Sequence, residues 1–346
     1  MDFTPKPEDK FTFGLWTVGN PGRDPFGEPV RQPLSAPEIV HLLADAGAYG
    51  VNFHDNDLVP IDATAAERDR IVRDFKAALQ ETGLVVPMAT TNLFTDPAFK
   101  DGAFTANDPA VRAYALQKTM RAIDLGVECG AGVYVFWGGR EGVETDAAKD
   151  PLEATKRFRE AINFLSAYSK DQGYSLKFAL EPKPNEPMDH AYVPTIGHAL
   201  AIAQLTAAPN RVGALIESAH AILAGLDPAD EIDFAMAFGK LWSLHLNDQN
   251  GLKFDQDKPF GSNNLRVAFN QIRALERNGY GRNGEFVCFD VHPFRTTKPD
   301  HWSAHLDNSR RTFDALVAKA RSFNEKQAAA LVADRDYQAL DQMVIE

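Results

Sequence analysis

Eight short apolar segments recur along this chain of 346 residues, and a longer stretch with helical spacing separates most of them. The segments are FTFGLWT (11–17), VNFH (51–54), VPMATT (86–91), VYVFWGG (133–139), KFALEPKP (177–184), VGALIES (212–218), LWSLHLN (241–247) and EFVCFDVHP (285–293). Strands that are apolar throughout are buried on both faces, as in a parallel sheet covered by helices. Eight strand–helix units within roughly 250 to 300 residues predict an α/β fold, a closed (β/α)₈ TIM barrel.

The stretches between these segments place apolar residues on one helical face. In RDRIVRDFKAALQETG, Ile71, Phe75 and Leu79 share a face, and the helix is expected to stop at Gly83. An open, doubly wound sheet is the alternative. It would be expected to carry a glycine-rich phosphate turn near its first strand, and no G-x-G-x-x-G follows residues 11–17.

The end of the chain, NEKQAAALVADRDYQALDQMVIE, is polar and helical in pattern. It resembles an extension more than a second core, and no linker precedes the mid-320s. We therefore expect residues 1–322 to form one catalytic barrel domain with a C-terminal helical extension. This extension, residues 323–346, is expected to be an arm that contacts another subunit.

Charge and cysteine content disfavour several partners and locations. The net charge of −12 and a pI near 5.3 argue against nucleic acid and anionic membranes as partners. Cys129 and Cys288 are the only cysteines, too few for a disulfide framework and typical of a reducing compartment. The N-terminus MDFTPKPEDK has no apolar signal region, and no run approaches the ~20 apolar residues of a membrane span. A soluble, cytoplasmic protein is expected.

Titratable side chains gather at the carboxyl ends of several predicted strands. They are His54, Asp57, Glu181, Lys183, Glu217, His220, His245 and Asp290, with Asp255 and Asp257 shortly after His245. In a barrel these ends meet at one mouth. One acid alone is more often a solvated loop residue, and Asp248 is interpreted in that way. The joint pattern predicts a metal centre, because burying unpaired charges is costly.

A set of carboxylates with one or two imidazoles and no thiolate suits Mg²⁺, Mn²⁺ or Co²⁺. Two such cations could hold neighbouring oxygens of a sugar and polarise its carbonyl. His54, oriented by Asp57, could act on the ring oxygen and open the pyranose. Lys183 could stabilise negative charge at O1, and aromatic walls would exclude water. A hydride could then pass between C1 and C2 without an organic cofactor.

Eight motifs resemble those of xylose isomerases of the short, actinobacterial type. They are FTFGLWTVGNPGRDPFG, FHDNDLVP, VPMATTNLF, GAFTANDPAVRAYALQKT, VFWGGREG, FALEPKPNEP, PTIGHALA and GLKFDQD. The resemblance covers the chain from about residue 3 to about residue 320 and is most specific over the first 200 residues. It implies a (β/α)₈ barrel, usually a tetramer, that interconverts aldoses and ketoses with two divalent metals.

The resemblance also implies a role for each site residue. His54 and Asp57 match a ring-opening pair, and Lys183 matches a lysine near the carbonyl oxygen. Ligands of a first metal are matched by Glu181, Glu217 and Asp290, and those of a second, hydride-shift metal by Glu217, His220, Asp255 and Asp257. Pocket residues are matched by Trp16, Thr90, Phe94 and Trp137. Phe26 matches an aromatic that a neighbouring subunit inserts into the site, and the C-terminal arm matches one that embraces a neighbour.

The second half of the chain departs from this family pattern. His245 stands where an aspartate ligand is usual, Ala221 where a glutamate is usual, Leu215 in place of asparagine and His292 in place of lysine. Rhamnose isomerases and sugar epimerases of the same superfamily have a histidine at the end of this strand. Since an imidazole removes one negative charge from the first site, we expect weaker Mg²⁺ binding and a preference for Mn²⁺ or Co²⁺.

Several functional hypotheses stay open. The leading one is an isomerase that converts D-xylose to D-xylulose and also D-glucose to D-fructose. The second is an isomerase or epimerase for another sugar, with substrate choice altered by His245, Leu215 and His292. The third is a metal-binding barrel without isomerase activity, although such a barrel would need neither His54 nor Lys183. A metal-bearing endonuclease of the same superfamily is a distant fourth, because the chain is acidic and has no basic stripe.

Overall fold

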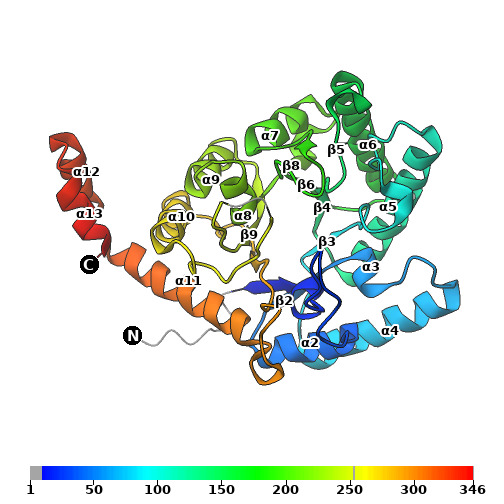
Figure 1. The fold of residues 1–346 in the computed structure, drawn as a ribbon, viewed down its shortest axis with the longest axis horizontal. Helices are drawn as coiled ribbons and strands as arrows, with labels where there is room; N and C mark the ends of the chain where they lie inside the picture. The colour runs from blue at the N-terminus through cyan, green and yellow to red at the C-terminus, as the bar shows by residue number, and fades with distance from the viewer. Residues whose placement is uncertain (1–9, 252–253, 346) are drawn as a thin grey trace.

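The computed structural model describes residues 10–251 and 254–345. Eight parallel strands close into a barrel in the order β1-β10-β9-β8-β6-β4-β3-β2, which confirms the predicted (β/α)₈ fold (Figure 1). They are β1 (Phe11–Gly14), β2 (Gly50–His54), β3 (Met88–Thr90), β4 (Val133–Trp137), β6 (Lys177–Glu181), β8 (Val212–Glu217), β9 (Leu241–Leu246) and β10 (Val287–Phe289). Outside the described residues lie positions 1–9 of the predicted domain, Leu252 and Lys253 of the GLKFDQD motif, and Glu346 of the arm.

Longer helices surround the barrel (Figure 1). They are α2 (Ala36–Asp45), α4 (Ala65–Thr82), α5 (Pro109–Cys129), α6 (Pro151–Asp171), α7 (Ile196–Leu205), α9 (Pro228–Ala237), α10 (Leu265–Asn278) and α11 (Ala304–Ser322). The predicted stop of α4 is present, since Gly83 ends this helix in a left-handed conformation. Asp108 accepts the N–H of Ala110 and caps the start of α5. Among the described helices, none combines the length and apolarity needed to span a bilayer.

Short elements follow the strand ends directly. The helices α1 (Leu15–Val18), α3 (Asp55–Leu58) and α8 (Ser218–Leu223) begin where β1, β2 and β8 stop. The strands β5 (Gly142–Val143) and β7 (His190–Ala191) form an antiparallel pair from the loops after β4 and β6. Single 3₁₀ turns lie at Pro97–Phe99, Asp146–Ala148, Pro209–Arg211 and Pro299–His301. The helices α1, α3 and α8 thus continue the chain from the carboxyl ends of their strands, the end at which the barrel mouth lies.

The barrel interior and its outer face contain different side chains, because neighbouring strand residues point to opposite sides. Phe53, Phe178 and Phe289 are fully buried in the main core with residues of the surrounding helices. A separate small cluster of Met88, Val135, Ala179 and Leu215 packs against Trp16. This inner cluster contains one residue from each of four strands, so it fills the barrel below the polar strand ends.

The C-terminal arm consists of α12 (Glu325–Asp334) and α13 (Tyr337–Ile345), which extend away from the barrel (Figure 1). Arg273 of α10 pairs with Glu325 through two hydrogen bonds of 3.0 and 2.7 Å. Val332, Tyr337 and Ile345 leave half or more of their surface exposed. The arm therefore presents apolar side chains to solvent in the single chain, and its role in a subunit contact stays a prediction.

Candidate active site

Strand alternation brings the predicted site residues to the inside of the barrel. Leu180 and Ile216 pack outward in the main core, so the next residues, Glu181 and Glu217, point inward. His245 is turned inward in the same way, since Leu244 and Leu246 on either side of it belong to the outer core. All three inward residues lie at carboxyl ends of strands, the end at which TIM barrels carry their active sites.

These strand ends enclose a cavity of about 550 Å³, a size typical of small-molecule sites. Every predicted site residue except Phe26 lines it. Lining residues that the sequence analysis missed are Met88, Asn92, Thr95, Arg140, Glu186 and Pro187. Most of them follow strand ends that were already singled out, and that position is the one signal that could have found them.

His245 is the centre of a first group of ligand atoms. Its Nδ1 atom lies 3.6 Å from a carboxylate oxygen of each of Glu181, Glu217 and Asp290. Both ring nitrogens lack a hydrogen-bond partner among the described residues, although His245 is only 2% exposed. Trp16 Nε1 donates to Asp290 Oδ1 at 2.7 Å and holds that carboxylate in place.

His220 is the centre of a second group. Its Nε2 atom lies 3.0 Å from Asp255 Oδ2 and 3.3 Å from Glu217 Oε1, so Glu217 belongs to both groups. Lys183 Nζ donates to Asp255 Oδ2 at 2.9 Å and lies 3.1 Å from Glu186. Burial alone would lower the pKa of Lys183, but the carboxylates of Asp255 and Glu186 outweigh burial and raise it, so Lys183 stays charged.

Asn247, which was not predicted as a site residue, joins acids of the two groups. Its Nδ2 atom donates to Glu217 Oε1 at 2.9 Å and to Asp257 Oδ1 at 3.1 Å. It directly follows β9 and is 1% exposed. The position immediately after His245 and Leu246 was the only sequence signal for this role.

Crowding of buried acids shifts their pKa values strongly. Burial, helped by Asp290 and Asp255, raises the pKa of Glu217 to about 8. Burial and the neighbouring Asp255 also raise the pKa of Asp257 well above its ordinary value. Burial would raise the pKa of Glu181 too, but the nearby imidazoles lower it to about 2. The protein alone therefore does not ionise all these carboxylates at neutral pH, and added positive charge would allow it.

This arrangement suits divalent cations. The sets Glu181–Glu217–His245 and Glu217–His220–Asp255 each offer ligand atoms within 4.8 Å of one another. A buried polar atom without a hydrogen-bond partner is costly, and a cation bound between the carboxylates and His245 Nδ1 would satisfy that atom. Oxygen and imidazole nitrogen ligands of this kind are used by Mg²⁺, Mn²⁺ and Co²⁺.

His54 and Asp57 form a pair on the opposite side of the cavity. Asp57 Oδ2 lies 2.9 Å from His54 Nδ1 and also accepts the His54 backbone N–H at 2.8 Å. Burial lowers the pKa of His54, but the charge and hydrogen bond of Asp57, with Asp290 and Asp55, outweigh it and raise the pKa. Since Nδ1 is occupied by Asp57, the other ring nitrogen is left for a ligand.

Three aromatic residues predicted for the pocket form a continuous wall around His54. Trp16 and Phe94 contact the His54 ring edge to face, with centroids 4.6 and 5.5 Å away. Phe94 meets Trp137 at 4.5 Å, and Lys183 Nζ lies 5.2 Å from the centre of the Trp137 ring. The wall therefore connects the His54–Asp57 pair to Lys183.

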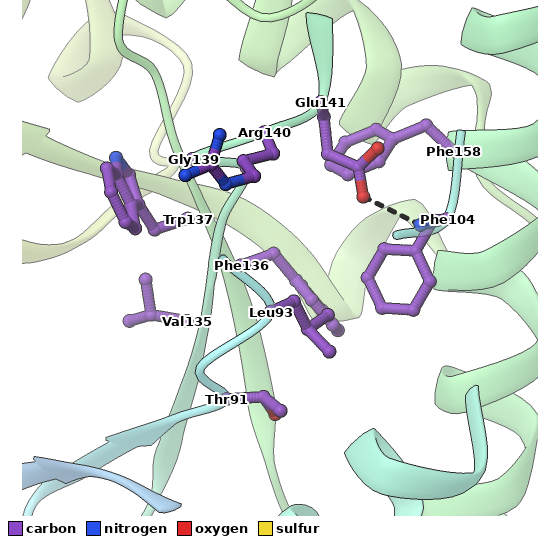
Figure 2. A pocket seen from close by; sticks show the side chains of 11 residues that line it. Thr91, Leu93, Phe104, Val135, Phe136, Trp137, Gly139, Arg140, Glu141 and Phe158 are labelled. Carbon is purple, nitrogen blue, oxygen red and sulfur yellow. Dashed lines mark hydrogen bonds between the residues drawn. The ribbon is translucent and has the colours of Figure 1, made fainter. Parts of the chain in front are cut away.

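Figure 2 shows the loop after β4, in which Arg140 and Glu141 follow Trp137 of this wall. The carboxylate of Glu141 is buried and accepts the Phe104 backbone N–H at 2.7 Å. Arg140 Nε donates to the carbonyl oxygen of Phe94 at 2.7 Å. Because Arg140 follows Trp137 by three residues, one short loop ties Trp137 and Phe94 together.

Phe26 lies outside the cavity and is 94% exposed, so its insertion into a neighbouring site stays a prediction.

The interpretation of Asp248 as a solvated acid is wrong. It is 2% exposed, and its Oδ2 atom accepts the N–H groups of Asn263 and Asn264 at 2.6 and 2.9 Å. Asp248 ties the end of β9 to the start of α10, a long-range contact that spacing alone did not indicate.

The sequence profile described as xylose isomerase-like TIM barrel matches residues 40–307. The chain is 50% identical over 323 residues to a xylose isomerase of Thermus thermophilus, covering 93% of this chain and 83% of that protein. The chain belongs to the xylose isomerase-like family. A xylose isomerase of Thermus caldophilus is 48% identical with the same coverage. Membership at this identity makes the chain an enzyme of the aldose–ketose isomerase class.

Solved structures with the same fold are more distant in sequence. An Escherichia coli 3-keto-D-glucoside 4-epimerase is 17% identical with a TM-score of 0.61, covering 89% of this chain and 98% of its own. A D-tagatose 3-epimerase-like protein is 15% identical at 0.62, with coverages of 87% and 98%. The IOLI protein with a bound zinc atom is 16% identical at 0.62, with coverages of 90% and 99%. At these identities the likeness concerns the fold alone.

Proposed function

We propose that the enzyme converts D-xylose to D-xylulose, and D-glucose to D-fructose as a second reaction. The ring of the sugar would open, and a hydride would shift between C1 and C2. One observation carries the proposal: His245 Nδ1 lies at the same distance from three carboxylates and makes no hydrogen bond with the described residues. It lines the same cavity as the His54–Asp57 pair. The identity of 50% to a xylose isomerase supports the choice of sugar.

His54 would act on the ring oxygen of the sugar. Asp57 holds Nδ1, which fixes the tautomer and leaves Nε2 to exchange a proton with the substrate. The raised pKa of His54 keeps a larger share of the imidazole protonated near neutral pH. Trp16 and Phe94 restrict rotation of the ring, so the proton is held close to one direction.

Lys183 would bind the carbonyl end of the opened sugar. Its ammonium group is buried, charged and fixed by Asp255 and Glu186. A donor in this position would stabilise negative charge that develops at O1. The aromatic wall of Trp16, Phe94 and Trp137 would exclude water from the opened chain.

We also propose two divalent cations per subunit and no organic cofactor. One would be held by Glu181, Glu217, His245 and Asp290, and the second by Glu217, His220, Asp255 and Asp257. When bound, the pair supplies Lewis-acid polarisation of the carbonyl and of the neighbouring hydroxyl. Because His245 replaces a carboxylate with a nitrogen ligand, we propose that Mn²⁺ or Co²⁺ supports activity better than Mg²⁺.

The assembly is proposed to be a homo-oligomer, either a tetramer or a dimer, located in the cytoplasm. The exposed Phe26 would enter the cavity of a neighbouring subunit, and the arm of α12 and α13 would cover a neighbour with Val332, Tyr337 and Ile345. The loop of Phe26 is held ready for this, since Arg295 Nη1 donates to the carbonyl oxygen of Glu28 at 2.7 Å. Neither nucleic acid nor a membrane is proposed as a partner.

A sugar panel tests the proposed function. The protein is stripped with a chelator, dialysed, and restored with Mg²⁺, Mn²⁺ or Co²⁺ separately, and ketose formation is measured from xylose, glucose, ribose and rhamnose. We expect the highest kcat/KM on xylose and activity only with added metal. Highest kcat/KM on another sugar, or turnover without metal, would contradict the proposal.

An isomerase or epimerase for another sugar is the second candidate, and His245 is the observation that favours it. Leu215 and His292, the other two changes named for this candidate, lie away from the cavity: Leu215 belongs to the inner cluster below it, and His292 does not line it. An epimerase that works by proton abstraction would invert one carbon and exchange its hydrogen with solvent. A product that remains an aldose, or remains a ketose, identifies this activity.

A further inference from the structure

A buried ion pair lies directly behind the ring-opening residues. Lys118 of α5 contacts Asp55 at the start of α3, and the two residues are 7% and 9% exposed. A buried pair gives up the hydration of two charges, and apolar residues of the same size often stabilise a fold at least as well. Its presence at this point therefore calls for an explanation other than stability.

Lys118 holds the turn that carries His54 and Asp57. Its Nζ atom donates to Asp55 Oδ2 and, at 3.1 Å, to Asn56 Oδ1. Asp55 and Asn56 are the two residues between His54 and Asp57. The helix α3 has only four residues, too few to maintain its shape by internal hydrogen bonds. One ammonium group from an outer helix thus fixes the segment that sets the distance within the pair.

Asp55 extends the same contact to the other side of the His54 ring. Its Oδ1 atom accepts the N–H of Asn92 at 2.8 Å. Asn92 Oδ1 in turn accepts from Thr95 Oγ1 at 2.8 Å and from the Phe94 N–H at 3.3 Å. Phe94 is the residue whose ring meets His54 edge to face. Both carboxylate oxygens of Asp55 are therefore used: Oδ2 accepts from Lys118, and Oδ1 accepts from Asn92, whose side chain holds Phe94.

We propose that Lys118 is a positioning residue for ring opening, which acts through Asp55 and Asn56 on His54 and Asp57. The inference rests on the proposed function, because it assigns His54 to the cyclic form of the sugar. Lys118 does not line the cavity and is not expected to contact substrate. Its contacts lead to the His54 side of the site, whereas Lys183, Asp255 and His220 are linked to one another on the other side. The later hydride shift should therefore depend less on Lys118.

The test compares a cyclic sugar with an aldose too short to close a ring. For Lys118→Met, kcat/KM is measured on the best cyclic aldose and on D-glyceraldehyde, with ketose formation followed in both. A misplacement of about 1 Å can cost on the order of 100-fold in rate, so we expect a loss of about 10- to 100-fold on the cyclic sugar. The loss on glyceraldehyde is expected to stay within about twofold, since that substrate needs no ring opening.

Lys149→Met is the matched control, because Lys149 is a second buried lysine that bonds to the carbonyl oxygens of Asp101 and Gly142. Lys149→Met should change kcat/KM by the same factor on the cyclic aldose and on D-glyceraldehyde. If Lys118→Met does not fold, the double variant Asp55→Asn with Lys118→Met removes both charges and should show the same selective loss. Equal losses on the two substrates, or no loss in a folded variant, would overturn the inference. A wild-type protein inactive on every aldose would instead contradict the proposed function.

Discussion

Asp57→Asn isolates the electrostatic support of His54. The hydrogen bond between His54 Nδ1 and Asp57 Oδ2 is 2.9 Å long, and the side chains are 12% and 21% exposed. A hydrogen bond to a charged group contributes about 1.5 to 3 kcal/mol, which corresponds to about 1 to 2 pKa units. Since Asp57 raises the pKa of His54, its loss should lower that pKa by about 1 to 2 units.

The assay follows the imidazole of His54 by NMR as a function of pH in wild type, Asp57→Asn and Asp62→Asn. His54→Gln assigns the resonance. Asp62 is an exposed acid in the loop after α3, so its removal takes away the same charge without a hydrogen bond to His54. The pH profile of kcat/KM on the cyclic sugar should shift in the same direction as the titration. A His54 midpoint in Asp57→Asn that equals the wild-type midpoint would refute the reasoning.

Further predictions concern the metals and stability. His245→Asp restores a carboxylate ligand and should raise the ratio of Mg²⁺ to Mn²⁺ affinity by about tenfold or more; calorimetry that finds an unchanged ratio would count against His245 as a ligand. Saturating Mn²⁺ at about 100 times its Kd should stabilise the chelator-stripped protein by about 3 kcal/mol, visible as a higher Tm, and an unchanged Tm would argue against a built site. Burial lowers the pKa of His305 to about 4, so the folded state resists a proton that the unfolded chain takes up near 6.5. The free energy of unfolding of the wild type should therefore fall by up to about 3 kcal/mol between pH 6.5 and 4, relative to that of His305→Gln. If the free energies of unfolding of the two proteins change in parallel with pH, this prediction is wrong.

The barrel could be predicted from the sequence because its strands are mostly apolar and several of them end in polar residues. In β8, for example, all six residues are buried, and the last of them is Glu217. Such a pattern leaves few alternatives to a closed parallel sheet. The short helices α1, α3 and α8 could not be predicted, since segments of four to six residues carry no periodic signal.

Members of the candidate site could be predicted where a strand end alone places them at the barrel mouth, and not where a distant contact does. His54, Glu181 and His245 follow directly from strand ends. The bond from Trp16 to Asp290 spans 274 positions, and that from Lys118 to Asp55 spans 63. Closure of the barrel brings Trp16 to Asp290, because β1 pairs with β10, and the packing of α5 against α3 brings Lys118 to Asp55. The interpretation of Asp248 was wrong because its hydrogen-bond partners lie 15 and 16 residues away, at the start of α10.

The central claim is a metal-assisted shift of hydride within one sugar, and deuterium transfer tests it most directly. The stripped enzyme is restored with Mn²⁺ and supplied with D-xylose in D₂O, and the D-xylulose formed is examined by NMR and mass spectrometry. The account predicts xylulose with no solvent deuterium at C1, and no product before metal is added. Xylulose that carries solvent deuterium at C1 would mean proton transfer in place of hydride transfer and would contradict the account.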